Sequence, residues 1–297
     1  MTINQKAYAK INLALNITGV QDNLHTIDTI MTTIDLFDEV SVKKTNDNTK
    51  VIFFKNKNSK PYIIENNSVE KTVGLFKKDF NIKDNFEVTV IKNIPIAAGL
   101  GGSGVDAAAT LIAICKLCNI DIVDKNSKNN ENYSKLENIA RQIGSDVVYQ
   151  LKGGFARIEG VGEKITSFSC NKSFNLVVAQ NTKTNGVLSK DSYRVLDEMY
   201  LEKEKLVCDI ENTIKILTSG DITDYSMFTN ALEKPSIFLN NSIVDTLMTL
   251  RENGAVHALM TGSGSACIGF FENKEIARQA AKNIKSQIGF AKYCRVL

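Results

Sequence analysis

A glycine-rich segment constrains the fold of this chain more than any other feature. Residues 94–106 read IPIAAGLGGSGVD, between a strand-like run at Phe86–Ile91 and an alanine-rich run at Gly104–Cys118 that is typical of a helix. Glycine lets a backbone approach a ligand closely and turn its amides toward it, and the N-terminus of a helix adds partial positive charge. The segment therefore predicts a phosphate-binding loop, and the alternative is a glycine-rich turn that only begins a helix.

Two well-known phosphate-binding motifs fit this segment poorly. A Walker A loop ends in Gly-Lys followed by Ser or Thr, and this loop has no lysine. Gly99, Gly101 and Gly104 match the spacing GxGxxG, and Asp121 lies about 20 residues further on, where a dinucleotide-binding fold places an acidic residue. The loop, however, begins with Pro95, and no clear second strand ending in the acidic residue follows it. A dinucleotide-dependent dehydrogenase therefore ranks below a kinase.

The remaining periodicities predict a mixed α+β chain. Apolar residues alternate over Tyr8–Ile17, which is typical of a strand, and Asn67–Phe80 has helical spacing. Val40–Val42 and Val51–Phe54 are expected to pair as a hairpin across the polar turn at Asn46–Asn48. Further helices are expected at 133–143, 188–199, 204–217, 242–251 and 274–284, further strands at 155–158, 176–179, within 256–271 and near 292–296, and a mobile loop at 126–132.

The length of the chain suggests two domains. It has 297 residues, and a domain contains about 150 residues on average. The region 153–162 is rich in glycine, which predicts a boundary there. We expect an N-terminal domain at 1–155 and a C-terminal domain at 156–297.

Composition and charge exclude several classes of function. The 36 basic and 33 acidic residues give a net charge of +3, which is too balanced to indicate nucleic acid or an acidic membrane as the main partner. No apolar run approaches the ~20 residues of a membrane span, and no signal-peptide core is seen, which predicts a cytoplasmic protein. Six scattered cysteines and two histidines predict neither a disulfide framework nor a dedicated metal site, and we expect buried thiols at Cys115–Cys118.

Five motifs follow one another along almost the whole chain. They are AYAKINLALNITG at 7–19, PxxAGLGG at 95–102 followed by DAAATL at 106–111, IGSDV at 143–147 followed by GVGE at 160–163, NxLE at 230–233, and MTGSGSA at 260–266. In this order they resemble the GHMP kinases, the superfamily of galactose, homoserine, mevalonate and phosphomevalonate kinases. AKINL, IGSDV and GVGE are most similar to the members that phosphorylate 4-diphosphocytidyl-2-C-methyl-D-erythritol.

The resemblance implies a fold and a reaction. The fold would be the two-domain α+β fold of GHMP kinases, with an N-terminal domain like a ribosomal-protein domain and a ferredoxin-like C-terminal domain. The reaction would transfer a phosphoryl group from ATP, with Mg²⁺, to the 2-hydroxyl of that substrate in non-mevalonate isoprenoid precursor biosynthesis. The partner would be this small molecule rather than nucleic acid or a membrane, and the chain would be a monomer or a homodimer.

The resemblance also implies roles for single residues. Lys10 and Asp146 match the catalytic pair: Asp146 would accept the proton of the substrate hydroxyl, and Lys10 would stabilise charge at the reacting oxygens. Asn12 matches a position near the substrate, and His25 matches a histidine that bonds the edge of cytosine. The residues that would hold ATP are Pro95, Ile96, Ala97, Ala98, Gly99, Leu100, Gly101, Gly102, Ser103, Gly104 and Val105. The residues of a second glycine loop that would contact the substrate are Thr261, Gly262 and Ser263.

Each of these residues also has a purely structural interpretation. Taken alone, Lys10 fits a surface lysine on a strand, and Asp146 fits a turn or helix-cap residue. Asn12 could be a structural amide and His25 an exposed loop residue, while Thr261–Ser265 could be a simple hairpin turn.

The sequence departs from the family pattern near the substrate. Leu24 stands where the family has an aromatic residue that stacks on cytosine, which can contribute ~1–3 kcal/mol per base. Tyr8, Tyr149 and Tyr193 are the tyrosines that could replace that ring.

The phosphate loop departs from the pattern as well. Gly104 and Val105 replace two serines, Ser103 stands one position earlier than expected, and Val148 replaces a proline. These changes leave open two alternatives: another small-molecule GHMP kinase of the homoserine or mevalonate type, and a non-catalytic nucleotide-binding paralogue.

Overall fold

The computed structural model of the chain describes residues 1–122, 131–170, 172–200, 204–219, 221–222 and 224–297. The chain forms two compact units, each built from separate stretches of sequence. Unit 1 consists of Met1–Ala9, Leu36–Ile94 and Gly101–Gly153, and unit 2 consists of Lys10–Asp35, Pro95–Leu100 and Gly154–Leu297. The domain boundary at residue 155 stays a prediction, and the loop expected at 126–132 lies mostly outside the described residues.

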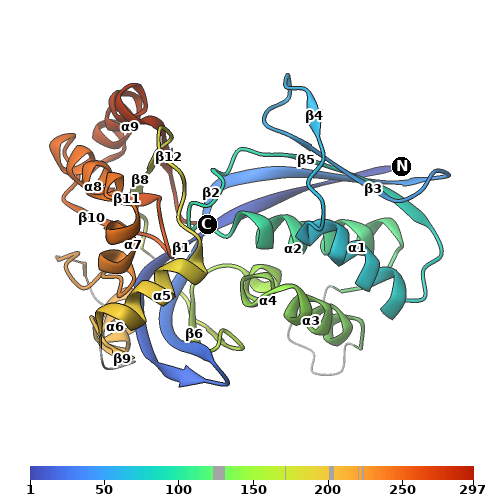
Figure 1. Cartoon of the computed structure of the whole chain (residues 1–297), viewed down its shortest axis with the longest axis horizontal. Coiled ribbons are helices and arrows are strands. Elements are labelled where there is room, and N and C mark those ends of the chain that lie inside the picture. Colours follow the sequence, from blue (N-terminus) through green and yellow to red (C-terminus); the bar gives the residue numbers. More distant parts are fainter. Residues whose placement is uncertain (123–130, 171, 201–203, 220, 223) are drawn as a thin grey trace. The chain divides into compact units, whose positions relative to one another are not determined.

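Helices and strands follow in a mixed order, without a regular βαβ repeat (Figure 1). The strands are β1 (Thr2–Gln21), β2 (Leu24–Thr45), β3 (Lys50–Phe54), β4 (Pro61–Tyr62), β5 (Asn85–Ile91), β6 (Ala156–Gly160), β7 (Lys164–Ser167), β8 (Asn175–Asn181), β9 (Glu204–Lys205), β10 (His257–Met260), β11 (Cys267–Phe271) and β12 (Gly289–Cys294). The helices are α1 (Ser68–Asp79), α2 (Gly102–Leu117), α3 (Glu131–Ile143), α4 (Ser145–Lys152), α5 (Ser189–Met199), α6 (Ile210–Ser219), α7 (Glu233–Leu239), α8 (Ser242–Glu252) and α9 (Lys274–Ile288). The long strands β1 and β2 contribute residues to both units.

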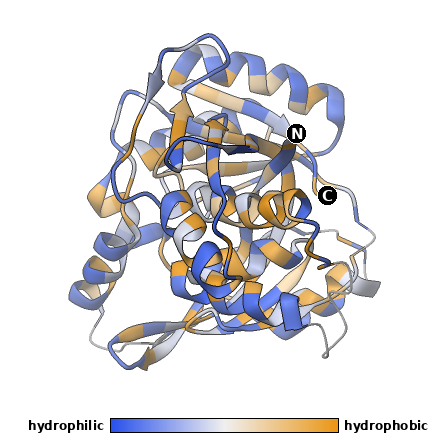
Figure 2. Cartoon of the chain, turned by 90° about the vertical axis from the view of Figure 1, so that its right-hand side faces the viewer, coloured by the Kyte–Doolittle hydropathy of each residue, from blue (hydrophilic) through white to orange (hydrophobic). Residues whose placement is uncertain are grey.

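Unit 1 combines strands with the helices α1 to α4. β5 pairs antiparallel with β2 and parallel with β3. Along β5, Phe86, Val88 and Val90 are buried while their neighbours are partly exposed, and this period of two directs one face of the strand toward a core. Helix α2 contacts α1, α3 and α4 and is buried on nearly all sides, which suits its alanine-rich sequence. Bands of hydrophilic and hydrophobic residues run along the helices, as expected when one face packs on a core (Figure 2).

Unit 2 contains an antiparallel sheet in the order β10-β11-β8-β12, on which α8 and α9 pack. Leu15 and Ile17, near the end of β1, belong to the same hydrophobic core as these elements. Helix α9 begins after Asn273, whose side chain accepts a hydrogen bond from the N–H of Ile276, the usual way to satisfy a free amide at a helix start. Residues 27–31 of β2 pair with β6 in this unit, and β6 pairs with β7.

Two predictions of local structure are wrong. The expected hairpin does not form, because β2 runs unbroken through Val40–Val42 and β5 lies between β2 and β3, so that Val51–Phe54 pairs in parallel with β5. The helix expected from residue 204 begins only at Ile210, because Glu204–Lys205 pairs with β1. The other predicted helices and strands are present, with ends shifted by a few residues.

The six cysteines are free thiols. The expectation of buried thiols at Cys115–Cys118 holds for Cys115 but not for Cys118, which is only partly buried at the C-terminal end of α2. None of the described helices combines the length and the apolar character needed to cross a membrane.

Candidate active site

Two glycine loops lie against each other in unit 2. The first is Pro95–Leu100, and the second, Thr261–Ser265, joins β10 to β11. A Cβ atom on Gly99 would lie 2.2 Å from the carbonyl oxygen of Thr261, and a Cβ atom on Gly262 would lie 2.6 Å from the carbonyl oxygen of Gly99. Both residues also have positive φ, +74° and +58°. No side chain fits at either position, which explains why the loops are built from glycine.

Backbone contacts fix the rest of the first loop. A Cβ atom on Gly186 would lie 2.2 Å from the carbonyl oxygen of Ala97, so this glycine permits a close approach to the loop. Ala97 itself has φ +51°, which is uncommon for a residue with a side chain. The carbonyl of Leu100 accepts a hydrogen bond from the N–H of Lys10 at 3.2 Å. The loop is therefore tied both to β1 and to the segment before α5.

Lys10 is a buried cation whose ammonium bonds the side-chain amide of Asn12. Lys10 is only 5% exposed, and its Nζ donates a hydrogen bond to Oδ1 of Asn12 at 2.8 Å. Nδ2 of Asn12 donates to Oγ1 of Thr29 at 2.8 Å, which orients the amide oxygen toward the ammonium. The backbone N–H of Asn12 donates to Oγ1 of Thr261 at 2.9 Å. Within the described part of unit 2 no carboxylate pairs with Lys10. A buried ammonium without an anionic partner is costly, which points to an anionic ligand as its natural partner.

The second glycine loop is held by side chains from α7 and the residues before it. Nδ2 of Asn230 donates to the carbonyl oxygens of Met260 and Gly262, both at 2.8 Å. Oγ of Ser236 donates to the carbonyl oxygen of Ser263 at 2.9 Å. These bonds satisfy carbonyl groups that a glycine turn would otherwise leave unpaired, and they leave the loop with a defined shape.

In unit 1 the helices α2 and α4 begin close together. Each follows a glycine, Gly101 and Gly144, and neither has a side-chain cap among the described residues. The first amides of α2 therefore remain free to bind an anion. A Cβ atom on Gly104 would lie 3.2 Å from Cβ of Asp146, which lies in the first turn of α4. Gly104 stands where the family pattern has serine, and its lack of a side chain allows this close approach.

A buried charge cluster connects α2 to the end of β5 and the residues that follow it. Nζ of Lys92 forms ion pairs with Oδ2 of Asp38 and, at 2.6 Å, with Oδ2 of Asp106 in α2. Asp38 also accepts hydrogen bonds from the backbone N–H groups of Asn93 and Ile94. Burial, opposed by Lys92 and reinforced by Asp38, raises the pKa of Asp106 to about 8. The cluster thus joins α2 to the segment that enters the first glycine loop.

His25 lies in an aromatic and acidic setting within unit 2. Its Nε2 is 2.9 Å from Oδ1 of Asp197, and its ring stacks on Tyr193 with centroids 4.7 Å apart and planes inclined by 19°. Of the three tyrosines considered as replacements for an aromatic residue at Leu24, Tyr193 therefore contacts the histidine. Tyr8 packs on Phe37 in unit 1, and Leu24 itself is 58% exposed.

The candidate residues are divided between the two units. Unit 2 holds Lys10, Asn12, His25, Pro95, Ile96, Ala97, Ala98, Gly99, Leu100, Thr261, Gly262 and Ser263, and unit 1 holds Gly101, Gly102, Ser103, Gly104, Val105 and Asp146. The structure brings Lys10, Asn12 and Thr261 into one network, whereas the contacts of His25 are with Asp197 and Tyr193. The roles assigned to these residues stay predictions.

Sequence reasoning missed several supporting residues. Asn230 stands in the NxLE motif, which could have identified it. Asp106 begins the DAAATL motif, and an acidic residue inside an apolar helix is itself a signal of a buried ion pair. Gly186 and Ser236 carry no local signal, because their importance depends on contacts with residues far away in sequence.

Comparison with known proteins assigns the family. The family described as GHMP kinases N terminal domain matches residues 67–155, and the one described as GHMP kinases C terminal matches residues 214–288. A 4-diphosphocytidyl-2-C-methyl-D-erythritol kinase of Clostridium perfringens is 34% identical over 292 residues, covering 97% of this chain and 96% of that protein. The same kinase of Clostridium tetani is 35% identical over 288 residues, covering 95% of each chain.

A solved structure agrees with these relatives. A crystal structure of 4-(cytidine 5'-diphospho)-2C-methyl-D-erythritol kinase has a TM-score of 0.78 and 25% identity, covering 99% of both chains. The predicted resemblance, the α+β fold of the GHMP kinases and the prediction of a small-molecule kinase are confirmed, and the dinucleotide-dependent dehydrogenase is excluded. The chain belongs to the GHMP kinases, in the family of the 4-diphosphocytidyl-2-C-methyl-D-erythritol kinases.

Proposed function

We propose that this chain transfers the terminal phosphoryl group of ATP to the 2-hydroxyl group of 4-diphosphocytidyl-2-C-methyl-D-erythritol. The observation that supports this most is the 34% identity to a kinase of that name, over 97% of this chain. Within the chain, the two glycine loops and the buried Lys10 supply what phosphoryl transfer requires, namely positioning and stabilisation of negative charge.

The backbone amides at the start of α2 would hold the phosphates of ATP. These amides have no side-chain cap, and Gly101 with φ +73° turns the chain into the helix. Among the described residues, no group of three or more His, Cys, Asp and Glu side chains could hold a metal ion. Mg²⁺ would therefore arrive with ATP and depend mainly on phosphate oxygens and water, as is common for this ion.

Asp146 and Lys10 would carry the chemical step. Asp146 accepts the proton of the substrate hydroxyl while the hydroxyl oxygen attacks the γ-phosphorus of ATP, and ADP leaves with the electrons of the broken bond. Lys10 stabilises the charge that spreads over the transferred group. Asn12 fixes the position of the Lys10 ammonium through the 2.8 Å hydrogen bond.

His25 and Tyr193 would bind the cytidine end of the substrate. Nε2 of His25 is engaged by Asp197, and Nδ1 can pair with the edge of cytosine. Tyr193 stacks on His25 and offers an aromatic surface where Leu24 cannot. This arrangement favours a cytidylylated substrate over homoserine or mevalonate, which have no base to stack.

The test is ADP release from the purified chain with Mg-ATP, with and without the cytidylylated substrate. We expect substrate-dependent release, and a fall of kcat by about 10²–10⁴ in Asp146→Asn because a general base is lost. Asp79→Asn, at the end of α1, is the matched control and should keep full activity.

Three other outcomes would contradict the proposal in different ways. Release of ADP with homoserine or mevalonate would refute the substrate. Undiminished activity in Asp146→Asn would refute the proposed base. Binding of ATP without turnover of any alcohol would identify a non-catalytic paralogue.

A further inference from the structure

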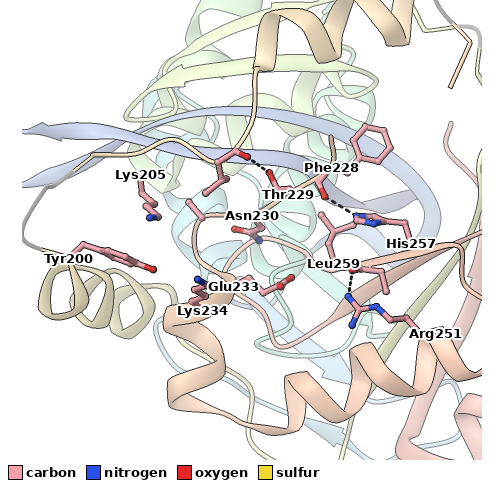
Figure 3. A pocket seen from close by; sticks show the side chains of 13 residues that line it. Tyr200, Lys205, Phe228, Thr229, Asn230, Glu233, Lys234, Arg251, His257 and Leu259 are labelled. Atoms are coloured by element: carbon pink, nitrogen blue, oxygen red, sulfur yellow. Dashed lines mark hydrogen bonds between the residues drawn. The ribbon is translucent and has the colours of Figure 1, made fainter. Parts of the chain in front are cut away.

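A pocket in unit 2 is lined by none of the residues to which we assign catalysis. It has a volume of about 360 Å³, within the ~300–1,000 Å³ that small-molecule sites occupy. It is lined, among others, by Tyr200 at the end of α5, Lys205 of β9, Arg251 of α8 and residues 228–231, 233 and 234 (Figure 3). The pocket is thus assembled from segments that are far apart in sequence.

The lining of this pocket is strongly basic. Lys205, Lys234 and Arg251 contribute three cations, and Glu233 is the only carboxylate among the described lining residues. None of the three cations forms an ion pair with another described residue. Nζ of Lys205 lies 4.4 Å from the ring centre of Tyr200, and Arg251 donates to the carbonyl oxygen of Ala258 at 3.3 Å. The N–H groups of the two ammonium groups, and most of those of the guanidinium, are therefore available to donate hydrogen bonds to an anion.

The arrangement of the cations favours a ligand charged at two ends. Lys205 and Lys234 lie on one side of the pocket with Tyr200, and Arg251 lies on the other side (Figure 3). A diphosphate group carries charged oxygens at both ends and accepts hydrogen bonds from lysine and arginine alike. A single phosphate would engage one side only.

The polar groups between the cations connect this pocket to the second glycine loop. Oε2 of Glu233 accepts a hydrogen bond from the N–H of Met260 at 2.9 Å, so its charge is already engaged. Asn230 donates to the carbonyl oxygens of Met260 and Gly262, both at 2.8 Å. A ligand that contacts Lys234 therefore lies next to Glu233, whose carboxylate bonds the residue before the second glycine loop.

We propose that this pocket binds a small diphosphate-bearing anion, and that its occupation is transmitted to the second glycine loop through Asn230 and Glu233. The proposal is independent of which alcohol the chain phosphorylates. It adds a second ligand site to the molecule, with inorganic diphosphate as its simplest probe.

The test is an NMR titration of the full-length, isotope-labelled protein with inorganic diphosphate, without ATP or Mg²⁺. We expect saturable shifts of the side-chain amide of Asn230 and the backbone amide of Gly262. Lys234→Gln and Arg251→Gln should each weaken the binding reported by Asn230 about tenfold, because each removes a charge-assisted hydrogen bond. Lys282→Gln on α9, an exposed lysine outside the pocket, is the matched control and should leave the binding unchanged.

Shifts at the start of α2 distinguish binding at the ATP site from binding in this pocket. Diphosphate bound at the start of α2 moves the amides of Gly101 and Gly104 equally in all variants, whereas the Asn230 signal should depend on Lys234 and Arg251. Equal affinities at Asn230 in all variants, or no shift of Asn230 while the amides of Gly101 and Gly104 saturate, would overturn the proposal. Orthophosphate that binds as tightly as diphosphate would overturn the preference for two charged ends.

Discussion

Replacing Lys92 with methionine is expected to lower the free energy of unfolding by about 3 kcal/mol. The side chain of Lys92 is 12% exposed, and those of Asp38 and Asp106 are 0% and 3% exposed, so the substitution leaves two carboxylates buried without their cation. Removal of one partner from a buried ion pair costs about 3–5 kcal/mol. We take the lower end because Asp106, with its pKa raised to about 8, can accept a proton and remove one of the two charges.

Urea unfolding followed by circular dichroism measures this loss. Lys43→Met is the matched control: Lys43 is 48% exposed, and its partner Glu87 also pairs with Lys50, so the cost should stay below about 1 kcal/mol. The double variant Lys92→Met/Asp106→Asn should regain part of the loss, because the amide leaves one buried charge without the proton uptake that Asp106 needs. If Lys92→Met costs no more than Lys43→Met, the cluster contributes little to stability and the reasoning is refuted.

Three further predictions concern pH, loop geometry and substrate recognition. Because the pKa of Asp106 is raised to about 8 in the folded chain, the folded state binds this proton more tightly than the unfolded state, and that contribution to stability is lost as pH rises from about 4 through 8. Asp106→Asn should flatten this fall in the free energy of unfolding, and an unchanged pH profile would contradict the assignment. Gly99→Ala should abolish activity, because the new Cβ would lie 2.2 Å from the carbonyl oxygen of Thr261. The control Gly74→Ala, whose Cβ would have nothing within 4 Å, should keep activity and raise the free energy of unfolding by about 1 kcal/mol, and equal activities of the two variants would refute the prediction. Tyr193→Leu should raise KM for the cytidylylated substrate about fivefold or more while Tyr193→Phe does not, and an unchanged KM in both would exclude stacking.

Local patterns were enough to predict the elements around the first glycine loop. The alternation at Phe86–Ile91, the glycines and the alanine-rich run each depend on neighbours in sequence, and β5, the loop and α2 follow as expected. The hairpin failed because alternation reveals that a segment is a strand but not which strand it pairs with. β3 pairs with β5, more than thirty residues away, and no turn signal marks a parallel partner.

The candidate site shows the same limit of local information. Motif resemblance identified Lys10, Asn12 and Thr261, and the structure joins them by hydrogen bonds although Thr261 lies 249 residues from Asn12. Gly186 could not be found, because its requirement for glycine comes from the carbonyl of Ala97 at 2.2 Å and from nothing nearby in sequence.

The interleaving of the two units has a consequence for how the protein is made. The chain passes from one unit to the other after Ala9, Asp35, Ile94, Leu100 and Gly153, so neither unit is a continuous piece of sequence. As the chain leaves the ribosome, β1 and the early part of β2 emerge long before the sheet and helices of residues 154–297 with which unit 2 is built. The N-terminal segments must therefore wait, with apolar residues such as Leu15 and Ile17 uncovered, until synthesis is nearly complete. A nascent chain arrested near residue 153 should accordingly be a strong client for chaperones.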